Sequence, residues 1–194
     1  MDSSAPPSHN DFALERILRG FRINRVLKYL GPDTLVCDVG CGYEGTFLRA
    51  VRDKVKGCWG IDCKVGPYSE GNLTLINGHI EKELPCESGT FDFVTMLAVL
   101  EHLENPENVV AECGRILKDG GRLAMTVPSH AGKPVLEVLA RMKMVDPQLV
   151  AEHRRYWNKA ELARLLKSAG FENIEHSYFL AGFNNFVTGT KAKP

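Results

Sequence analysis

Leu35-Val-Cys-Asp-Val-Gly-Cys-Gly-Tyr-Glu-Gly-Thr-Phe-Leu48 is the stretch of this chain that decides its fold. A short apolar run ends at Asp38, and Gly40, Gly42 and Gly45 follow before an apolar helical pattern begins. This order predicts a buried strand, a tight glycine turn and the N-terminus of a helix. Glycine lets a ligand approach the backbone closely, and the free N–H groups with the helix dipole favour an anionic group. The stretch therefore predicts a nucleotide-like ligand.

Asp62 provides a second polar group for the same place. It follows the apolar run 57–61, which predicts another short strand. In a sheet of parallel strands Asp62 lies beside the glycine turn, where a carboxylate can accept hydrogen bonds from both hydroxyls of a ribose. A lone acid at a strand end is most often a turn residue, but its pairing with the glycine turn favours a binding role.

Strand and helix patterns alternate along the rest of the chain. They predict an α/β fold, doubly wound and Rossmann-like, with a mostly parallel seven-stranded sheet. The last two strands are close enough to pair as a hairpin, which makes the C-terminal strand antiparallel. The expected helices are 12–30, 45–51, 105–117, 134–145 and 158–170, and the expected strands are 34–37, 57–61, 72–77, 91–96, 122–127, 174–180 and 186–190.

The composition is that of one ordinary globular domain of 194 residues, 44% hydrophobic and 25% charged. The 24 basic residues balance the 24 acidic ones, so no global field points to nucleic acid or an anionic membrane. Residues 1–10 are rich in Ser and Pro and predict a disordered tail without the core of a signal peptide. No apolar run approaches the roughly 20 residues of a membrane span.

The six cysteines form no Cys-x-x-Cys pair, and several lie inside apolar strand patterns. This spacing argues against a disulfide framework or a structural zinc site and favours reduced thiols. We therefore expect a cytoplasmic protein with no metal. Residues 11–194 are expected to form a single domain.

Three further motifs carry a resemblance to a known family: the segment Glu83-Leu-Pro-Cys-Glu-Ser-Gly-Thr-Phe-Asp-Phe-Val-Thr-Met-Leu-Ala-Val-Leu-Glu-His-Leu-Glu-Asn-Pro106, the segment Arg115-Ile-Leu-Lys-Asp-Gly-Gly-Arg-Leu-Ala-Met-Thr-Val-Pro128, and Glu161-Leu through Ala169-Gly-Phe171. With the glycine turn and Gly-Ile-Asp62, they resemble the class I S-adenosylmethionine-dependent methyltransferases of the type 11 subset, especially those of quinone biosynthesis. The resemblance covers residues 22–190. It implies S-adenosylmethionine as cofactor, S-adenosylhomocysteine as product, and methyl transfer to a small-molecule or lipid-linked acceptor at oxygen.

The resemblance also implies which residues bind the cofactor. Asp38, Gly40 and Gly42 would frame its methionine part, and Asp62 would hold the ribose. Arg22, in Phe21-Arg-Ile-Asn24, matches a helix arginine that reaches the cofactor carboxylate in the quinone methyltransferases. A solvated helix arginine is the alternative.

Two more cofactor positions follow from the same resemblance. Ile80 stands where the family contacts the adenine, and Leu97 matches a position that lines the sulfonium end. The chain departs from the family in two ways. The turn has one additional residue between Gly42 and Gly45, and His79 stands where many members carry an Asp facing the adenine. We expect His79 to be an exposed loop residue.

Gly40-x-Gly42-x-x-Gly45 also fits the dinucleotide fingerprint, which makes an NAD-dependent oxidoreductase the alternative. Three features argue against an NAD-dependent oxidoreductase: the position of Asp38 before the turn, the shortness of the chain and the C-terminal hairpin. A non-catalytic module that binds S-adenosylmethionine is a further alternative, because cofactor residues predict binding rather than turnover.

Methyl transfer to oxygen needs an aligned acceptor and a group that removes its proton. His102, in Glu-His102-Leu after the fourth strand, is the candidate catalytic base, with a packing histidine as the alternative. His130, His153 and Tyr156 are further candidates. Residues 129–157 are expected to shape the acceptor site, with Met142 in a helix that forms its wall. We expect no nucleic-acid partner and a monomer or homodimer.

Overall fold

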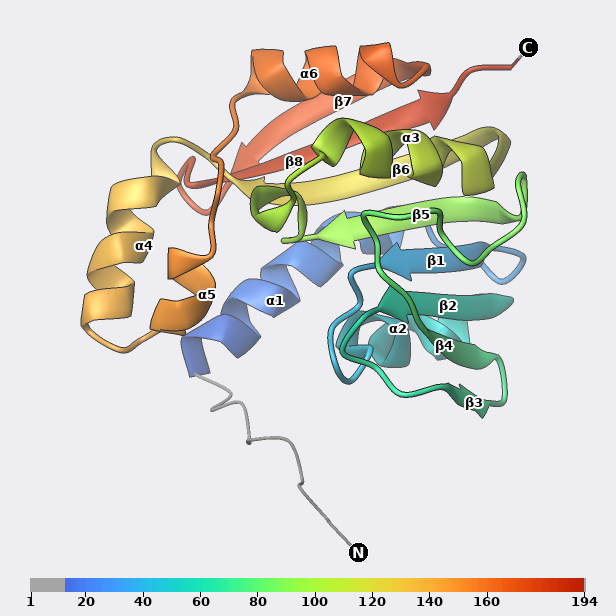
Figure 1. Ribbon diagram of the computed structural model, residues 1–194, viewed down its shortest axis with the longest axis horizontal. Helices are drawn as coiled ribbons and strands as arrows, with labels where there is room; N and C mark the ends of the chain where they lie inside the picture. Colours follow the sequence, from blue (N-terminus) through green and yellow to red (C-terminus); the bar gives the residue numbers. More distant parts are fainter. Residues whose placement is uncertain (1–12, 194) are drawn as a thin grey trace, which may run out of the picture.

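Eight strands form a single sheet in the computed structural model, which describes residues 13–193 (Figure 1). In chain order they are β1 (Leu35–Val39), β2 (Gly57–Asp62), β3 (Tyr68–Glu70), β4 (Leu73–Asn77), β5 (Phe91–Leu97), β6 (Leu117–Pro128), β7 (Phe171–Phe179) and β8 (Asn184–Lys191). Their spatial order is β3-β4-β2-β1-β5-β6-β8-β7. The five central strands from β4 to β6 are parallel, and β8 runs antiparallel to both β6 and β7.

The predicted doubly wound fold and its antiparallel last strand are confirmed. The eighth strand is β3, which pairs antiparallel with its neighbour β4 at the edge of the sheet. No sequence pattern indicates it, because its three residues are all exposed and lack an apolar alternation.

Helices cover both faces of the sheet. They are α1 (Ala13–Val26), α2 (Thr46–Val51), α3 (Pro106–Ile116), α4 (Gly132–Arg141), α5 (Pro147–Ala151) and α6 (Lys159–Ser168), with the short 3-10 turns η1 (Leu27–Tyr29), η2 (Arg52–Lys54) and η3 (Leu100–His102). Buried side chains of α3 and α6 form one hydrophobic core with the sheet, and those of α1 and α2 form a second. Among residues 13–193 no helix is long and apolar enough to cross a bilayer.

The local signals of helix ends explain the bounds of α6. Asn158 accepts a hydrogen bond from the backbone N–H of Glu161 at 3.0 Å, and the Glu161 carboxylate accepts one from the N–H of Asn158 at 2.8 Å. This is a capping box, which is typical of an Asn followed three residues later by a Glu at the start of a helix. Gly170, with φ of 81°, turns the chain into β7.

Several predicted boundaries are wrong, and three of them differ most from the structure. The first helix ends at Val26 and continues only as η1, and residue 12 lies outside the described residues, as does the predicted tail 1–10. Residues 118–121, which lie between the expected helix 105–117 and the expected strand 122–127, belong to β6, which begins at Leu117 and contains a register shift opposite Phe91 and Phe93. The helix expected over 134–145 is α4, which stops at Arg141.

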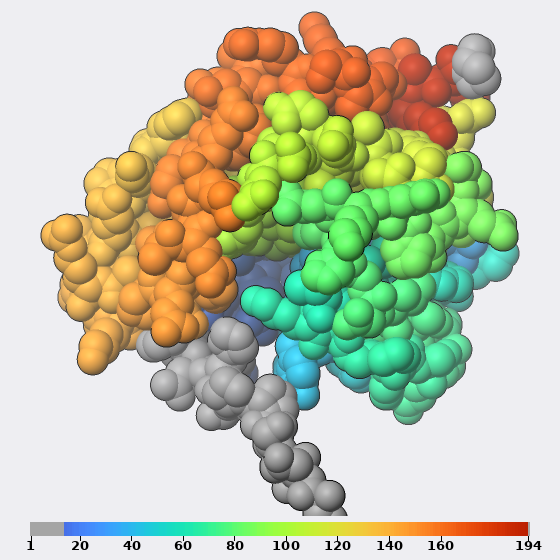
Figure 2. Space-filling model, viewed as in Figure 1, coloured from blue at the N-terminus to red at the C-terminus, as the bar shows by residue number. Residues whose placement is uncertain are grey.

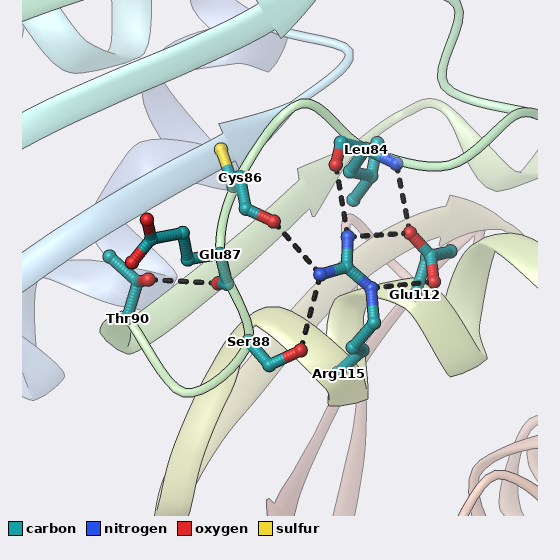
Figure 3. Close-up of polar contacts among 7 residues, drawn as sticks. All are labelled: Leu84, Cys86, Glu87, Ser88, Thr90, Glu112 and Arg115. Carbon is teal, nitrogen blue, oxygen red and sulfur yellow. Dashed lines mark hydrogen bonds and ion pairs between the residues drawn. The ribbon is translucent and has the colours of Figure 1, made fainter.

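The connection between β4 and β5 is held by one arginine of α3 (Figure 3). The Arg115 guanidinium donates to the carbonyls of Leu84 at 2.9 Å and Cys86 at 2.8 Å. It also bonds the Glu112 carboxylate, with both N···O distances at 2.8 Å. Such a bidentate pair fixes geometry as well as adding energy. Arg115 is therefore a structural clamp that orders this connection.

Candidate active site at the carboxyl ends of the strands

The glycine turn after β1 has the backbone that its sequence predicts. Gly40, Gly42 and Gly45 have φ of 79°, 69° and 60°, a region that other residues rarely adopt. The N–H of Gly42 donates to Oδ2 of Asp62 at 2.9 Å, and Oδ1 of Asp62 accepts from the N–H of Lys64 at 2.8 Å. The structure thus brings Asp62 to the turn, as expected. Each carboxylate oxygen keeps a second lone pair for a ligand hydroxyl.

Asp38 lies beneath this turn rather than on its surface. Its side chain is buried between β1 and β5, with the residue 3% exposed, and Oδ1 accepts a hydrogen bond from the Thr95 hydroxyl at 2.6 Å. Burial raises the pKa of Asp38 to about 7, although the Thr95 hydrogen bond acts in the opposite direction, and the nearby Asp62 charge raises it further.

A second group of polar side chains collects just beyond β5. Leu97 ends the strand, and Ala98 adopts a left-handed conformation with φ of 61° that turns the chain into η3. A non-glycine residue there costs about 1 kcal/mol or more and is typical of functional sites. The turn carries Glu101, which is 1% exposed, and His102, which is half-buried.

The segment after α5 closes over the same turn. The backbone carbonyl of Glu101 accepts from the N–H of Arg154 at 2.8 Å, which brings the neighbouring His153 against His102. The two imidazole rings lie edge to face with centroids 4.9 Å apart. Nδ1 of His153 is 3.2 Å from the Tyr156 hydroxyl. In Figure 2 this segment borders a hollow in the surface, with η3 on another side and α1 at its floor.

Three buried polar atoms in this cluster have no hydrogen-bond partner in the described structure. They are Nε of Arg22, Oε2 of Glu101 and Nδ1 of His102. Buried polar groups are almost always satisfied, and an orphaned one costs about 1–3 kcal/mol. Three of them together indicate a place where a polar ligand completes the structure.

Burial also dominates the ionisation of this cluster. It raises the pKa of Glu101 to about 7, although the Arg22 charge acts against that rise. It lowers the pKa of His153 to about 4, helped by the nearby charges of His102 and Arg22, and it lowers the pKa of His102 as well. Both imidazoles are therefore neutral near pH 7.

The comparison with known protein families decides the class of this site. Residues 14–176 match the family model described as a methyltransferase domain. The chain belongs to the methyltransferase domain family. S-adenosylmethionine is thus the cofactor, as the sequence predicted, and the NAD-dependent alternative falls away.

Named relatives agree with this family. The chain is 31% identical over 127 residues to the 2-methoxy-6-polyprenyl-1,4-benzoquinol methylase, mitochondrial, of Caenorhabditis elegans, and this match covers 58% of this chain and 45% of the relative. It is 29% identical over 152 residues to the ubiquinone biosynthesis O-methyltransferase of Dechloromonas aromatica, where the match covers 72% of this chain and 65% of the relative. This methyltransferase therefore spans between about half and two thirds of the length of these curated relatives.

A solved structure shares the fold. The phosphoethanolamine N-methyltransferase 2 of Haemonchus contortus, solved with phosphomonomethylethanolamine and S-adenosylhomocysteine, aligns with a TM-score of 0.65 at 16% identity. The alignment covers 89% of this chain and 53% of that one.

The residues of this methyltransferase fit S-adenosylmethionine. The unpartnered Nε of Arg22 suits a carboxylate, and the space that a Cβ on Gly42 would enter is open for at least 4 Å. Ile80 is half-buried against the core that contains α3 and α6, and Leu97 is half-buried against the core that contains α1 and α2. His79 is exposed, as the sequence predicted.

Of the other candidate bases, His130 is exposed and pairs with the Glu161 carboxylate at 3.2 Å, away from the cluster. Glu101 is the residue that sequence reasoning missed, although an acid inside the apolar stretch 96–103 was the available signal. Glu101, His102 and His153 have ligand atoms within 4.8 Å of one another, a spacing that a metal ion could bridge. The positive guanidinium of Arg22 acts on the same three groups and would oppose such an ion.

Replacing Asp38 with asparagine tests whether burial raises the pKa of this carboxyl group. A raised pKa means that the folded state binds more protons than the unfolded state between pH 4 and 7, so wild-type stability falls as pH rises through this range. An asparagine at this position does not ionise, and its side-chain oxygen can still accept from Thr95. We compare the free energy of unfolding of Asp38→Asn with that of wild type at each pH. The difference, variant minus wild type, should rise by on the order of 3 kcal/mol between pH 4 and 8.

Urea unfolding of the cofactor-free methyltransferase at pH values of about 4.5, 6, 7 and 8, which bracket the range over which Asp38 ionises, measures this difference. Asp53→Asn is the matched control, because the Asp53 side chain is 94% exposed. A difference for Asp38→Asn that is flat across these pH values would contradict the assignment.

Proposed function

We propose that this methyltransferase moves the methyl group of S-adenosylmethionine to a hydroxyl oxygen of a small-molecule or lipid-linked acceptor. The observation that carries the proposal is the partly buried cluster of Arg22, Glu101, His102 and His153, which contains three buried polar atoms without a partner in the described structure. The relative named ubiquinone biosynthesis O-methyltransferase supports oxygen as the target, and the benzoquinol methylase of Caenorhabditis elegans supports a ring-bearing acceptor.

The cofactor would be held by residues of α1, β1, β2 and β5 and of the turns that follow β1 and β4. Gly40 and Gly42 leave room for its methionine part, Arg22 pairs with its carboxylate, and Asp62 accepts from the ribose hydroxyls. Asp38 supports the turn from below through Thr95. Ile80 and Leu97 would contact the adenine and the sulfonium end.

S-adenosylmethionine would supply a methyl group bonded to a positively charged sulfur. This sulfur is a good leaving group when an oxygen lone pair attacks the methyl carbon in line. The protein aligns the acceptor and removes its proton. We assign this step to His102, and the support for it is that Nδ1 has no hydrogen-bond partner among the described residues. Its lowered pKa keeps the ring neutral, which is the form that accepts a proton. Glu101 and His153 hold His102 in place.

Residues 129–157 would shape the acceptor site. Their isolated bridge between Ser129 and Trp157 closes the segment at its base, and α4 and α5 lie between these ends (Figure 1). The described cysteines are all free, in line with the reduced, cytoplasmic environment that we propose. A monomer or homodimer without nucleic acid completes the proposal.

Transfer of labelled methyl from S-adenosylmethionine to a panel of phenols, catechols, amines and thiols tests this function. We expect methylated oxygen in a phenol or catechol product, identified by mass and fragmentation. Asp62→Asn should weaken cofactor binding about 10-fold to 100-fold, because it removes charged hydrogen bonds to the ribose. Asp53→Asn should leave binding unchanged.

Calorimetry of S-adenosylmethionine binding separates the outcomes. Tight binding with no methylated acceptor would favour the non-catalytic module. Methylation of an amine or thiol instead would refute oxygen as the target while leaving the cofactor site intact.

A further inference from the structure

The end of α4 exposes an alternation of cations and large apolar side chains. Arg141, Met142, Lys143 and Met144 are all exposed, Met142 by 63% and Met144 by 41%, and Val138 one turn earlier is 51% exposed. We call these five residues the α4 tip. Single exposed apolar residues are ordinary on a protein surface, but a contiguous group marks an interaction site.

The whole helix is poorly covered by the protein. Only Gly132 and Ala140 are buried, although α4 also carries Val135, Leu136 and Leu139. Figure 2 shows α4 forming the outer edge of the molecule, on the left of the view. The neighbouring α1 is joined to this region by the hydrogen bond from the N–H of Asp146 to Glu15 at 2.7 Å, and it exposes Ile17 by 56%.

The backbone at the tip is held in a conformation that lysine disfavours. Lys143 has φ of 54°, its N–H donates to the Ala140 carbonyl, and the N–H of Met144 donates to the Leu139 carbonyl, each at 2.9 Å. These two bonds form the motif that commonly ends a helix with glycine at the left-handed position. A lysine there carries strain that glycine would not, so the charge is retained at a cost in stability.

The charge of this region contrasts with the neutral chain. The segment 132–144 contains Lys133, Arg141 and Lys143 against the single acid Glu137. No ion pair within residues 13–193 involves Arg141 or Lys143. Basic residues interleaved with apolar ones on a helix are typical of segments that lie in the interface of an anionic bilayer.

We propose that the α4 tip docks on the surface of an anionic lipid bilayer, with Met142 and Met144 entering the interface and Arg141 and Lys143 contacting lipid phosphates. The docking is peripheral, because no described helix can span a bilayer. The α4 tip belongs to the segment 129–157 that we propose to shape the acceptor site, but docking requires neither methyl transfer nor a particular acceptor.

Vesicle co-sedimentation of the full chain tests this proposal. We expect binding to vesicles of phosphatidylcholine with roughly one third phosphatidylglycerol, weak binding to phosphatidylcholine alone, and a loss of binding as salt rises to about 0.5 M. The variant Arg141→Gln/Lys143→Gly should bind about 30-fold more weakly, which corresponds to about 2 kcal/mol. The affinity of Met142→Ser/Met144→Ser for these vesicles should be lower by at least about 10-fold, because less apolar surface enters the bilayer.

Two comparisons separate docking from damage to the fold. Lys143→Gly alone should raise the melting temperature by about 2–4 °C while it weakens vesicle binding, because it relieves the strain and removes a charge. Lys54→Gln/Lys56→Gln removes two exposed charges near the start of β2, on the opposite side of the molecule from α4 in Figure 1, and should bind within about threefold of wild type.

Equal loss in the Lys54/Lys56 variant, or wild-type binding that does not depend on anionic lipid, would overturn the proposal. So would a dimer in light scattering that Met142→Ser/Met144→Ser dissociates while the wild type ignores vesicles, because a second copy would then be the occupant of the α4 tip.

Discussion

His102→Gln should lower kcat for a phenolic acceptor by about 100-fold to 10,000-fold, the range over which a positioned general base contributes. Glutamine is close to histidine in size and hydrogen-bonds, but it cannot take a proton. The binding constant of S-adenosylmethionine should stay within about threefold, because His102 is assigned to the acceptor rather than to the cofactor. Steady-state kinetics and calorimetry measure the two quantities.

The acidity of the acceptor distinguishes a base from a packing residue. With a dinitrophenol, whose hydroxyl is fully ionised at neutral pH, the defect of His102→Gln should shrink towards wild-type rates, since no proton has to be removed. An equally large defect for both phenols would show that His102 only holds the structure. His130→Gln serves as the control, because His130 is exposed and bound to Glu161, and it should change kcat by less than about threefold.

Gly40→Ala should destabilise the fold by about 3 kcal/mol and weaken S-adenosylmethionine binding by at least about tenfold. A Cβ on Gly40 would lie 2.5 Å from Cγ2 of Val99, and φ of 79° is a strained conformation for alanine. The displaced turn would also break the hydrogen bond from the Gly40 N–H to the Ile61 carbonyl, which measures 2.8 Å. Chemical denaturation and calorimetry check both effects.

Two variants separate the clash from the backbone strain. Gly42→Ala has a similar φ of 69° but meets nothing within 4 Å, so its loss of stability should be limited to about 1–2 kcal/mol. Val99→Ala should cost less stability in the Gly40→Ala background than in wild type, by about 1 kcal/mol or more, because it removes the colliding methyl groups. Additive effects of the two changes would refute the clash.

Local sequence was sufficient for the parts of the fold that short-range physics dictates. The strand before Asp38, the three glycines with positive φ and the capping box of Asn158 and Glu161 all follow from a few adjacent residues. Parallel order then places the end of β2 beside β1, so the meeting of Asp62 with the turn was predictable as well.

The boundaries that failed have two causes, a contact between distant residues and an unusual local conformation. The residues 118–121 have the composition of a turn, yet pairing of Leu117 with Phe91 draws them into β6. The early end of α4 depends on a left-handed lysine, a conformation that sequence statistics assign to glycine.

The sequence by itself determined the class of fold, the glycine turn and the family of this methyltransferase, because these depend on local backbone preference and on residues spaced along a few strands. Tertiary structure alone decided that Asp38 is buried against Thr95, that Glu101 joins His102 and His153, and that Val138, Met142 and Met144 are exposed. The reason is physical. Burial, desolvation and the loss of hydrogen-bond partners arise only when segments far apart in the chain are packed together.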